Sequence, residues 1–132
     1  MNLVLEKENY NIRNVHFYDS VKNTVMEDSS FIRIIYSDEF IVLNGIHIKI
    51  DINTKDDNMN GELLSFVDKV ETSILEKYPI KKTYIRKIKE QLIFMIKKNY
   101  QINNNVIFIL KISGIWETSK MIGLTFKIMY VT

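Results

Sequence analysis

The last quarter of the chain contains two runs of β-branched and aromatic residues, and these restrict its fold more than any other feature. The first run covers residues 106–112 and the second covers residues 123–131. A short connection between them carries Trp116, the one tryptophan of the sequence, and Lys120. Two such runs joined by a short connection predict a β-hairpin. The fold must therefore end in two neighbouring antiparallel strands.

The first half of the chain also has the pattern of β-strands. Apolar and β-branched residues dominate three segments, residues 13–18, 31–36 and 40–52. After Gly45, isoleucines at every second position alternate with His47, Lys49 and Asp51, so one side of this strand is apolar. The Asn44-Gly45 pair predicts either a two-residue hairpin turn or a bend within one long strand.

The middle of the chain changes to the period of a helix. Apolar residues recur at spacings of three and four over residues 62–78, which predicts an amphipathic helix that Asn60 caps and Pro79 ends. A second helix is expected to begin at Thr83. Residues 92–98 suit a buried helix face or a strand, and periodicity does not decide between them. Polar loops are expected around residues 20–30, 53–61 and 100–105.

This order of elements predicts an α+β or mainly β fold within one domain, residues 1–132. A five-stranded OB-like barrel with one or two helices inserted between its third and fourth strands fits the order, and OB-folds bind oligonucleotides on their strands and adjoining loops. An antiparallel sheet with two helices packed on one face is the alternative.

Composition narrows the class of protein. The chain is 46% hydrophobic and 26% charged, as in soluble globular proteins, and it has no cysteine for a disulfide or a thiolate zinc site. No apolar run approaches the length of a membrane span, so we expect an intracellular protein without a membrane partner. The net charge is only +2, but residues 79–100 hold 7 Lys and Arg against one Glu. This uneven charge predicts a basic face or, equally, an ordinary solvated helix surface.

Two segments resemble a known group of proteins. Residues 34–50, with the Asn44-Gly45 pair, and residues 108–128, with the run Ser113 to Glu117, are similar to small proteins of large nucleocytoplasmic DNA viruses. That group is itself held to be similar to the OB-fold single-stranded-DNA-binding proteins of viruses and phages. The resemblance covers about a third of the chain. It implies an OB-fold, binding of single-stranded DNA in viral DNA replication, and location in the host cytoplasm or viral factory, with packaging in the virion as a further expectation.

A site for single-stranded nucleic acid needs cations for phosphates and aromatic rings for bases. Strand alternation places several such side chains away from the apolar rows, and the predicted binding set is Arg33, His47, Lys49, Lys111, Trp116, Lys120 and Lys127. An accessory basic patch on the middle of the chain comprises Lys81, Lys82, Arg86, Lys87 and Lys89. Each prediction has a plainer alternative. Trp116 can be a core anchor, and lysines on strands can simply face solvent and protect edges.

Catalysis and metal binding have no recognisable motif. The sequence lacks a nucleophile elbow, a glycine-rich phosphate loop and an HExxH run, so we expect no enzyme activity and no cofactor. Acidic residues from Asp51 to Glu62 follow the spacing of a calcium loop, but Lys55 occupies a ligand position and Asp56 replaces the required glycine. The expected partners are single-stranded nucleic acid and replication or virion proteins. The alternative function is a virion structural or protein–protein interaction module, with Ile93, Phe94 and Met121 in its interface.

Overall fold

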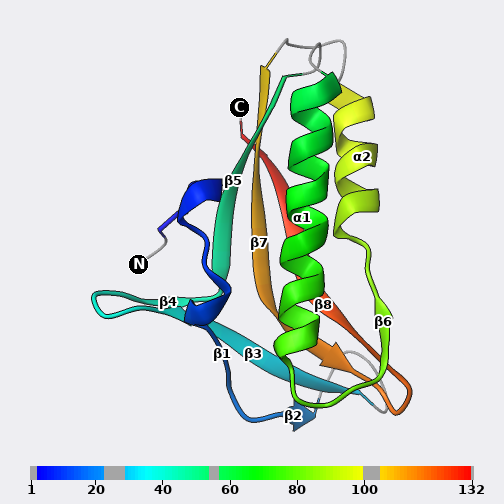
Figure 1. Cartoon of the computed structure of the whole chain (residues 1–132). Helices are drawn as coiled ribbons and strands as arrows, with labels where there is room; N and C mark the ends of the chain where they lie inside the picture. Colours follow the sequence, from blue (N-terminus) through cyan, green and yellow to red (C-terminus); the bar gives the residue numbers. More distant parts are fainter. Residues whose placement is uncertain (1–2, 23–28, 54–56, 100–104, 132) are drawn as a thin grey trace.

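The computed structural model describes residues 3–22, 29–53, 57–99 and 105–131. Within them, a curled sheet of the half-barrel type packs against two helices (Figure 1). The elements are η1 (Lys7–Asn9), η2 (Ile12–Asn14), β1 (Val15–Phe17), β2 (Val21–Lys22), β3 (Ser30–Ser37), β4 (Val42–Asn44), β5 (Ile46–Asn53), α1 (Asp57–Lys77), β6 (Thr83–Ile85), α2 (Ile88–Asn99), β7 (Asn105–Glu117) and β8 (Met121–Val131). The predicted mixture of helices with a barrel-like sheet is confirmed at this level.

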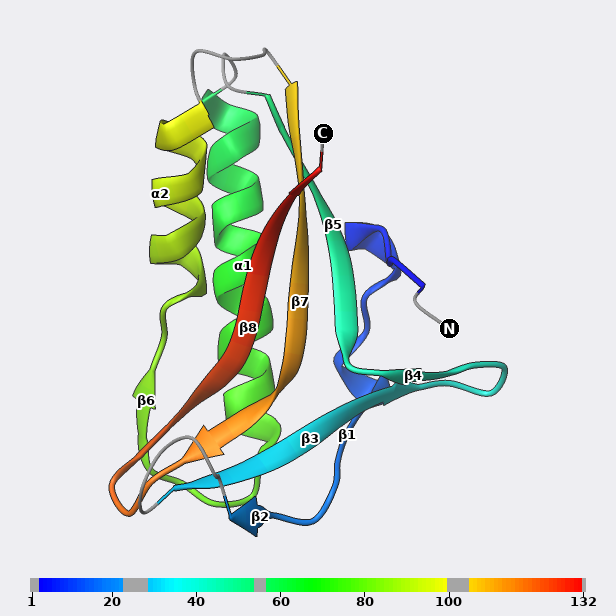
Figure 2. The same ribbon diagram turned by 180° about the vertical axis from the view of Figure 1, so that it is seen from behind.

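Strand β7 is the centre of the sheet. On one side, β5 pairs with its first half and β3 with its last four residues, while β8 runs along its other side. The short β6 pairs with β8 in parallel orientation, and β1, β2 and β4 pair with β3. Figure 2 shows β3 turning away from β7 toward β4, while β5 runs alongside β7. The predicted C-terminal hairpin is therefore present, but its strands are longer than expected and Trp116 lies within β7 instead of in the connection.

The Asn44-Gly45 pair forms a bend, so the second of its two interpretations is correct. Gly45 has a φ of 89°, a left-handed conformation that glycine adopts without strain, and its N–H donates to the carbonyl of Ile34. The chain turns there from β4, which pairs with β3, into β5, which pairs with β7. The hairpin turn lies earlier, where the Asp38 carboxylate accepts hydrogen bonds from the N–H groups of Phe40 and Ile41.

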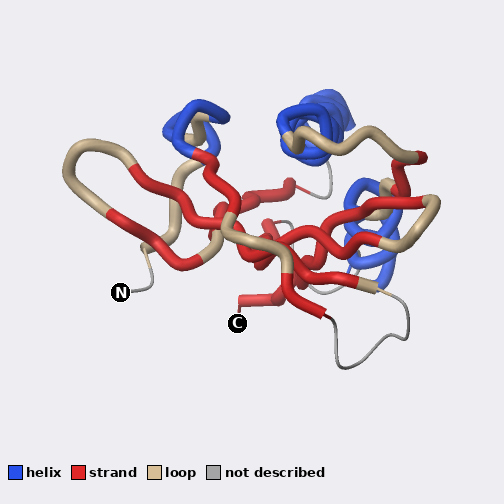
Figure 3. Tube along the Cα trace, turned by 90° about the horizontal axis from the view of Figure 1, so that it is seen from below, coloured by secondary structure: helices blue, strands red, loops and turns tan. Residues whose placement is uncertain are grey.

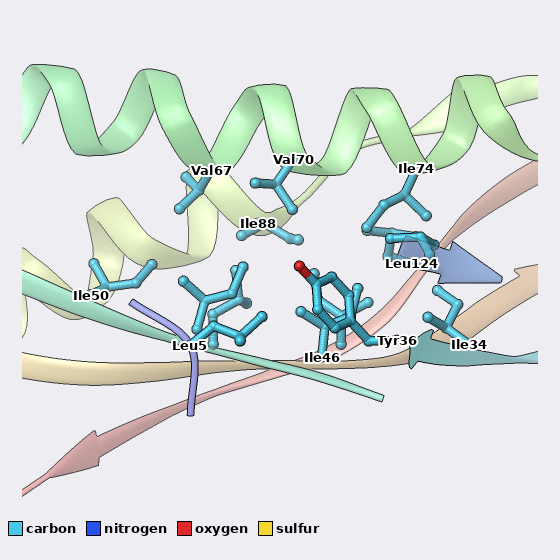
Figure 4. Packing of buried hydrophobic residues seen from close by; sticks show 14 of the residues in the cluster. Leu5, Ile34, Tyr36, Ile46, Ile50, Val67, Val70, Ile74, Ile88 and Leu124 are labelled. Carbon is cyan, nitrogen blue, oxygen red and sulfur yellow. The ribbon is translucent and has the colours of Figure 1, made fainter. Parts of the chain in front are cut away.

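One face of the sheet packs on α1 and forms the core. The isoleucines of β5 at positions 46, 48, 50 and 52 are all buried, as the alternation predicts. Alternate residues of β7, including Phe108 and Leu110, lie in the same layer because β5 and β7 are in register. Val67, Val70 and Ile74 of α1 point down onto this layer (Figure 4). The helices α1 and α2 lie along this side of the curved strand layer (Figure 3), and no described helix packs on the opposite face, which we call the uncovered face.

Two predictions about the helices need correction. Thr83–Ile85 is the edge strand β6, and α2 begins only at Ile88, where the buried Glu71 carboxylate accepts hydrogen bonds from the N–H groups of Lys87 and Ile88. Burial raises the pKa of Glu71, and these two hydrogen bonds partly oppose that rise. Asn60 is not a cap, because α1 begins at Asp57.

Residues 92–98 are helical, which decides between the two structures left open for them. The predicted loops at residues 20–30, 53–61 and 100–105 lie partly outside the described residues.

Candidate nucleic-acid interface

The uncovered face of the sheet carries most of the predicted binding set. Residues that alternate with the buried row of each strand must point to this face. Arg33 of β3 and Lys127 of β8 are exposed there, whereas Lys111 of β7 is partly buried between its neighbours. His47 and Lys49 of β5 lie on the same face and are also partly exposed. The fold thus brings together five cationic or ionisable side chains from four strands.

Three of these side chains form a row across the sheet. His47 of β5 pairs with Lys111 of β7, which in turn pairs with Lys127 of β8. Neighbouring strands are about 4.8 Å apart, so the row spans about 10 Å. Burial and the charge of Lys111 lower the pKa of His47, which favours the neutral form of the imidazole. The fixed charges of the row are therefore those of Lys111 and Lys127.

The cations of this face are largely free of carboxylates. Within the described part of the chain, no ion pair involves Arg33, Lys111 or Lys127. Lys49 is different, because Glu6 lies 3.8 Å from its ammonium group. Like charges placed opposite one another on a sheet destabilise it unless an anion offsets them. A bound anion would offset this repulsion.

Two aromatic rings lie beside these cations. Phe31 of β3 and Trp116 of β7 are directly paired and belong to the uncovered face. Each ring covers a glycine of the next strand: a Cβ placed on Gly114 would be 2.6 Å from the Phe31 ring, and one on Gly123 would be 2.5 Å from the Trp116 indole. Both rings therefore pack over the backbone of a glycine. The indole also borders a hollow of about 250 Å³ at the edge of β8.

A smaller pocket lies at the junction of β3, β4 and β7, where the pairing partner of β7 changes from β5 to β3. Its volume is about 150 Å³, and its lining residues are Phe31, Arg33, Asn44, Lys111 and Ser113. Ser113 occupies a β-bulge, since the pairing of β7 with β8 shifts register between Ile112 and Gly114. Bulges re-aim side chains and are frequent near functional sites. Two cations, an amide, a hydroxyl and a ring thus surround one small space.

The remaining predicted residues lie elsewhere. Lys120 is exposed in the β7–β8 turn. In the accessory patch, Lys81 donates to carbonyl groups at the end of α1, and Arg86 contacts Asp68 at 3.6 Å and Thr72 at 3.1 Å. Lys87 and Lys89 are exposed near the start of α2. The patch lies near the ends of the helices, and its Lys87 lines the same hollow as Trp116.

Lys82 belongs to a partly buried polar cluster. Its ammonium group lies 2.8 Å from Glu117 and donates to the carbonyl of Thr118 at 2.6 Å, while the Tyr78 hydroxyl donates to Glu117 at 2.8 Å. Burial of Glu117 alone would favour the uncharged acid, but the hydrogen bonds from Lys82 and Tyr78 outweigh burial and lower the pKa of Glu117. Burial and the adjacent carboxylate raise the pKa of Tyr78 to about 12.

Replacing Lys82 with methionine should lower the free energy of unfolding by about 2 kcal/mol near neutral pH, because Glu117 then remains buried without its cation. The lowered pKa of Glu117 contributes stability above its unfolded value of 4.5, and this contribution is lost as the pH falls through the folded value. The difference between wild type and variant should therefore shrink on acidification, as measured by urea unfolding at several pH values.

Lys89→Met, on the exposed side of α2, is the matched control and should change stability by less than about 0.5 kcal/mol. A difference between wild type and Lys82→Met that stays constant with pH would contradict the assigned role of the ion pair.

Comparison of the chain with protein-family models, with curated proteins and with solved structures finds no match. The viral resemblance of residues 34–50 and 108–128 therefore stays a prediction. No described helix is both long enough and apolar enough to pass through a membrane. Among the described residues, no three His, Asp or Glu side chains lie close enough together to hold a metal ion.

Three residues that line the junction pocket were outside the predicted binding set: Phe31, which the sequence assigned to the core, and Asn44 and Ser113. Phe31 shares the parity of Arg33 along β3, and this signal could have placed it on the uncovered face. No comparable signal exists for Asn44 and Ser113, because their positions depend on the bend at Gly45 and on the bulge in β7.

Proposed function

We propose that the protein binds single-stranded nucleic acid on the uncovered face of its sheet. One observation carries the proposal: the cations of Arg33, Lys111 and Lys127, which have no carboxylate partner in the described structure, lie on the same face as the rings of Phe31 and Trp116. Cations bind phosphates with release of counterions, and flat rings stack with bases of any sequence. Both parts of a sequence-tolerant site are therefore present.

The expected ligand is single-stranded DNA, and the expected process is viral DNA replication, as the resemblance implies. The bases of a duplex are stacked on one another and are not accessible to protein side chains. Stacking on the two rings should therefore favour unpaired strands over a duplex. The OB-like barrel stays a prediction. The proposal relies only on the curled sheet and its uncovered face. OB-fold barrels likewise bind oligonucleotides on the surface of their strands.

Titration with oligothymidylate tests this function. Trp116 is the only tryptophan, so quenching of tryptophan fluorescence reports contact at this face. Three phosphate contacts predict a slope of roughly −2 for the logarithm of the binding constant against the logarithm of salt concentration. A duplex of the same length is the control and should bind more weakly. The absence of both quenching and a mobility shift at low salt would rule the function out.

The alternative, a protein–protein interaction module, is favoured by the β3–β4 hairpin. This hairpin projects from the body of the protein (Figure 2), and Phe40 and Val42 are 88% and 72% exposed beside Asp38 and Glu39. Exposed apolar side chains of this kind commonly mark a contact with another protein. Phe40→Ser separates the two functions, because it removes the apolar tip while oligothymidylate binding, measured by the same titration, should stay unchanged.

A further inference from the structure

The pocket at the junction of β3, β4 and β7 has the features of a specific anion site. Arg33 and Lys111 line it, and within the described residues neither of them has an ion pair. Asn44 and Ser113 add an amide and a hydroxyl that can donate hydrogen bonds without adding charge. The volume of about 150 Å³ exceeds the roughly 30 Å³ that one water occupies in the liquid, so a larger group fits.

We propose that this pocket holds the terminal phosphate monoester of a nucleic-acid strand. The inference rests on the proposed function and specifies which part of the ligand the pocket binds. A monoester carries a charge of about −1.5 to −2 near pH 7 and has three strong acceptor oxygens. An internal phosphodiester carries a single negative charge. Two free cations and two neutral donors therefore match the monoester better than the diester.

The shape of the junction pocket suits the end of a nucleic-acid strand better than its interior. Side chains of β3, β4 and β7 surround the pocket, so a phosphate within it has protein on several sides. An internal phosphate is connected to the strand on two sides, whereas a terminal phosphate needs only one connection. Phe31 also lines the pocket, and its ring lies over Gly114. The terminal phosphate can therefore enter the pocket while the adjoining base stacks on this ring and the next base reaches Trp116.

The test compares three oligothymidylates of equal length that carry an internal fluorophore: one with hydroxyls at both ends, one with a 5′-phosphate and one with a 3′-phosphate. We expect one phosphorylated form to bind about tenfold more tightly than the unphosphorylated strand, by anisotropy at low salt. Equal affinities for all three would overturn the inference and leave the proposed function intact. Failure of all three to bind would overturn both.

Two variants test whether the preference for a terminal phosphate arises in this pocket. Asn44→Ala removes a neutral donor on an exposed position of β4, so it should bring the phosphorylated and unphosphorylated strands to similar affinity without changing the salt dependence of the unphosphorylated one. Lys127→Ala is the matched control, because Lys127 lies on the same face and does not line the pocket. It should weaken all three strands by a similar factor. A preference that survives in Asn44→Ala and disappears in Lys127→Ala would contradict the assignment of the pocket.

Discussion

Replacing Gly114 with alanine should destabilise the native state by about 3 kcal/mol, at the upper end of the usual cost of overpacking. A Cβ at this position would be 2.3 Å from the carbonyl oxygen of Ile32 and 2.6 Å from the Phe31 ring. The oxygen belongs to the backbone of the paired strand β3, so relief requires β3 and β7 to move apart. Urea unfolding followed by circular dichroism measures the loss.

Gly123→Ala is the matched control for this substitution. Its added Cβ would meet only the Trp116 indole among the three nearest atoms, and a side chain can move more easily than a backbone. We expect a smaller loss of about 1 kcal/mol together with a shift of tryptophan emission as the indole leaves the sheet. Equal losses in the two variants would show that the contact with Ile32 is not what requires glycine at position 114.

Replacing Lys111 with glutamate should weaken oligothymidylate binding by at least about tenfold at low salt. The substitution removes one phosphate contact and places a negative charge between Lys127 and Arg33, at the centre of the uncovered face. Loss of one contact should also reduce the salt slope by roughly 0.7 for a single strand. Fluorescence titration at several salt concentrations measures both quantities.

Lys97→Glu changes the net charge by the same amount at an exposed position in the last turn of α2. It should alter the affinity far less than Lys111→Glu, since the proposed binding face is on the other side of the sheet. Similar effects of the two variants would mean that the nucleic acid responds to net charge and has no site on this face.

Local pattern was sufficient to identify the long strands and most of the long helix, but not the short strands β2 and β6. The alternation after Gly45 identified the buried isoleucines of β5 and placed His47 and Lys49 on the opposite face, and the same parity placed Arg33 correctly. The start of the second helix was not predictable in this way. Residues 83–85 pair with β8 and α2 is capped by Glu71 of α1, and both are contacts between segments distant in sequence.

The position of Trp116 shows a second limit of local pattern. Parity counted from the buried Ile112 would place Trp116 on the core side, but the bulge at Ser113 shifts the alternation by one residue and moves the indole to the uncovered face. A bulge depends on the register between three strands, and a single run of apolar residues carries no information about it. The junction pocket arises from the same bulge, so it too required the three-dimensional arrangement.

The central position of β7 has a consequence for how the chain acquires its structure. Strands β3 and β5 are translated long before β7, with which both of them pair. Pairings so distant in sequence slow folding, because loop-closure entropy opposes them until the late strand arrives. During synthesis, the apolar residues of β3 and β5 stay exposed until β7 has been translated. Exposed apolar residues of unpaired strands promote aggregation. We therefore expect the yield of soluble protein to increase when translation is slowed or a chaperone that holds nascent chains is supplied.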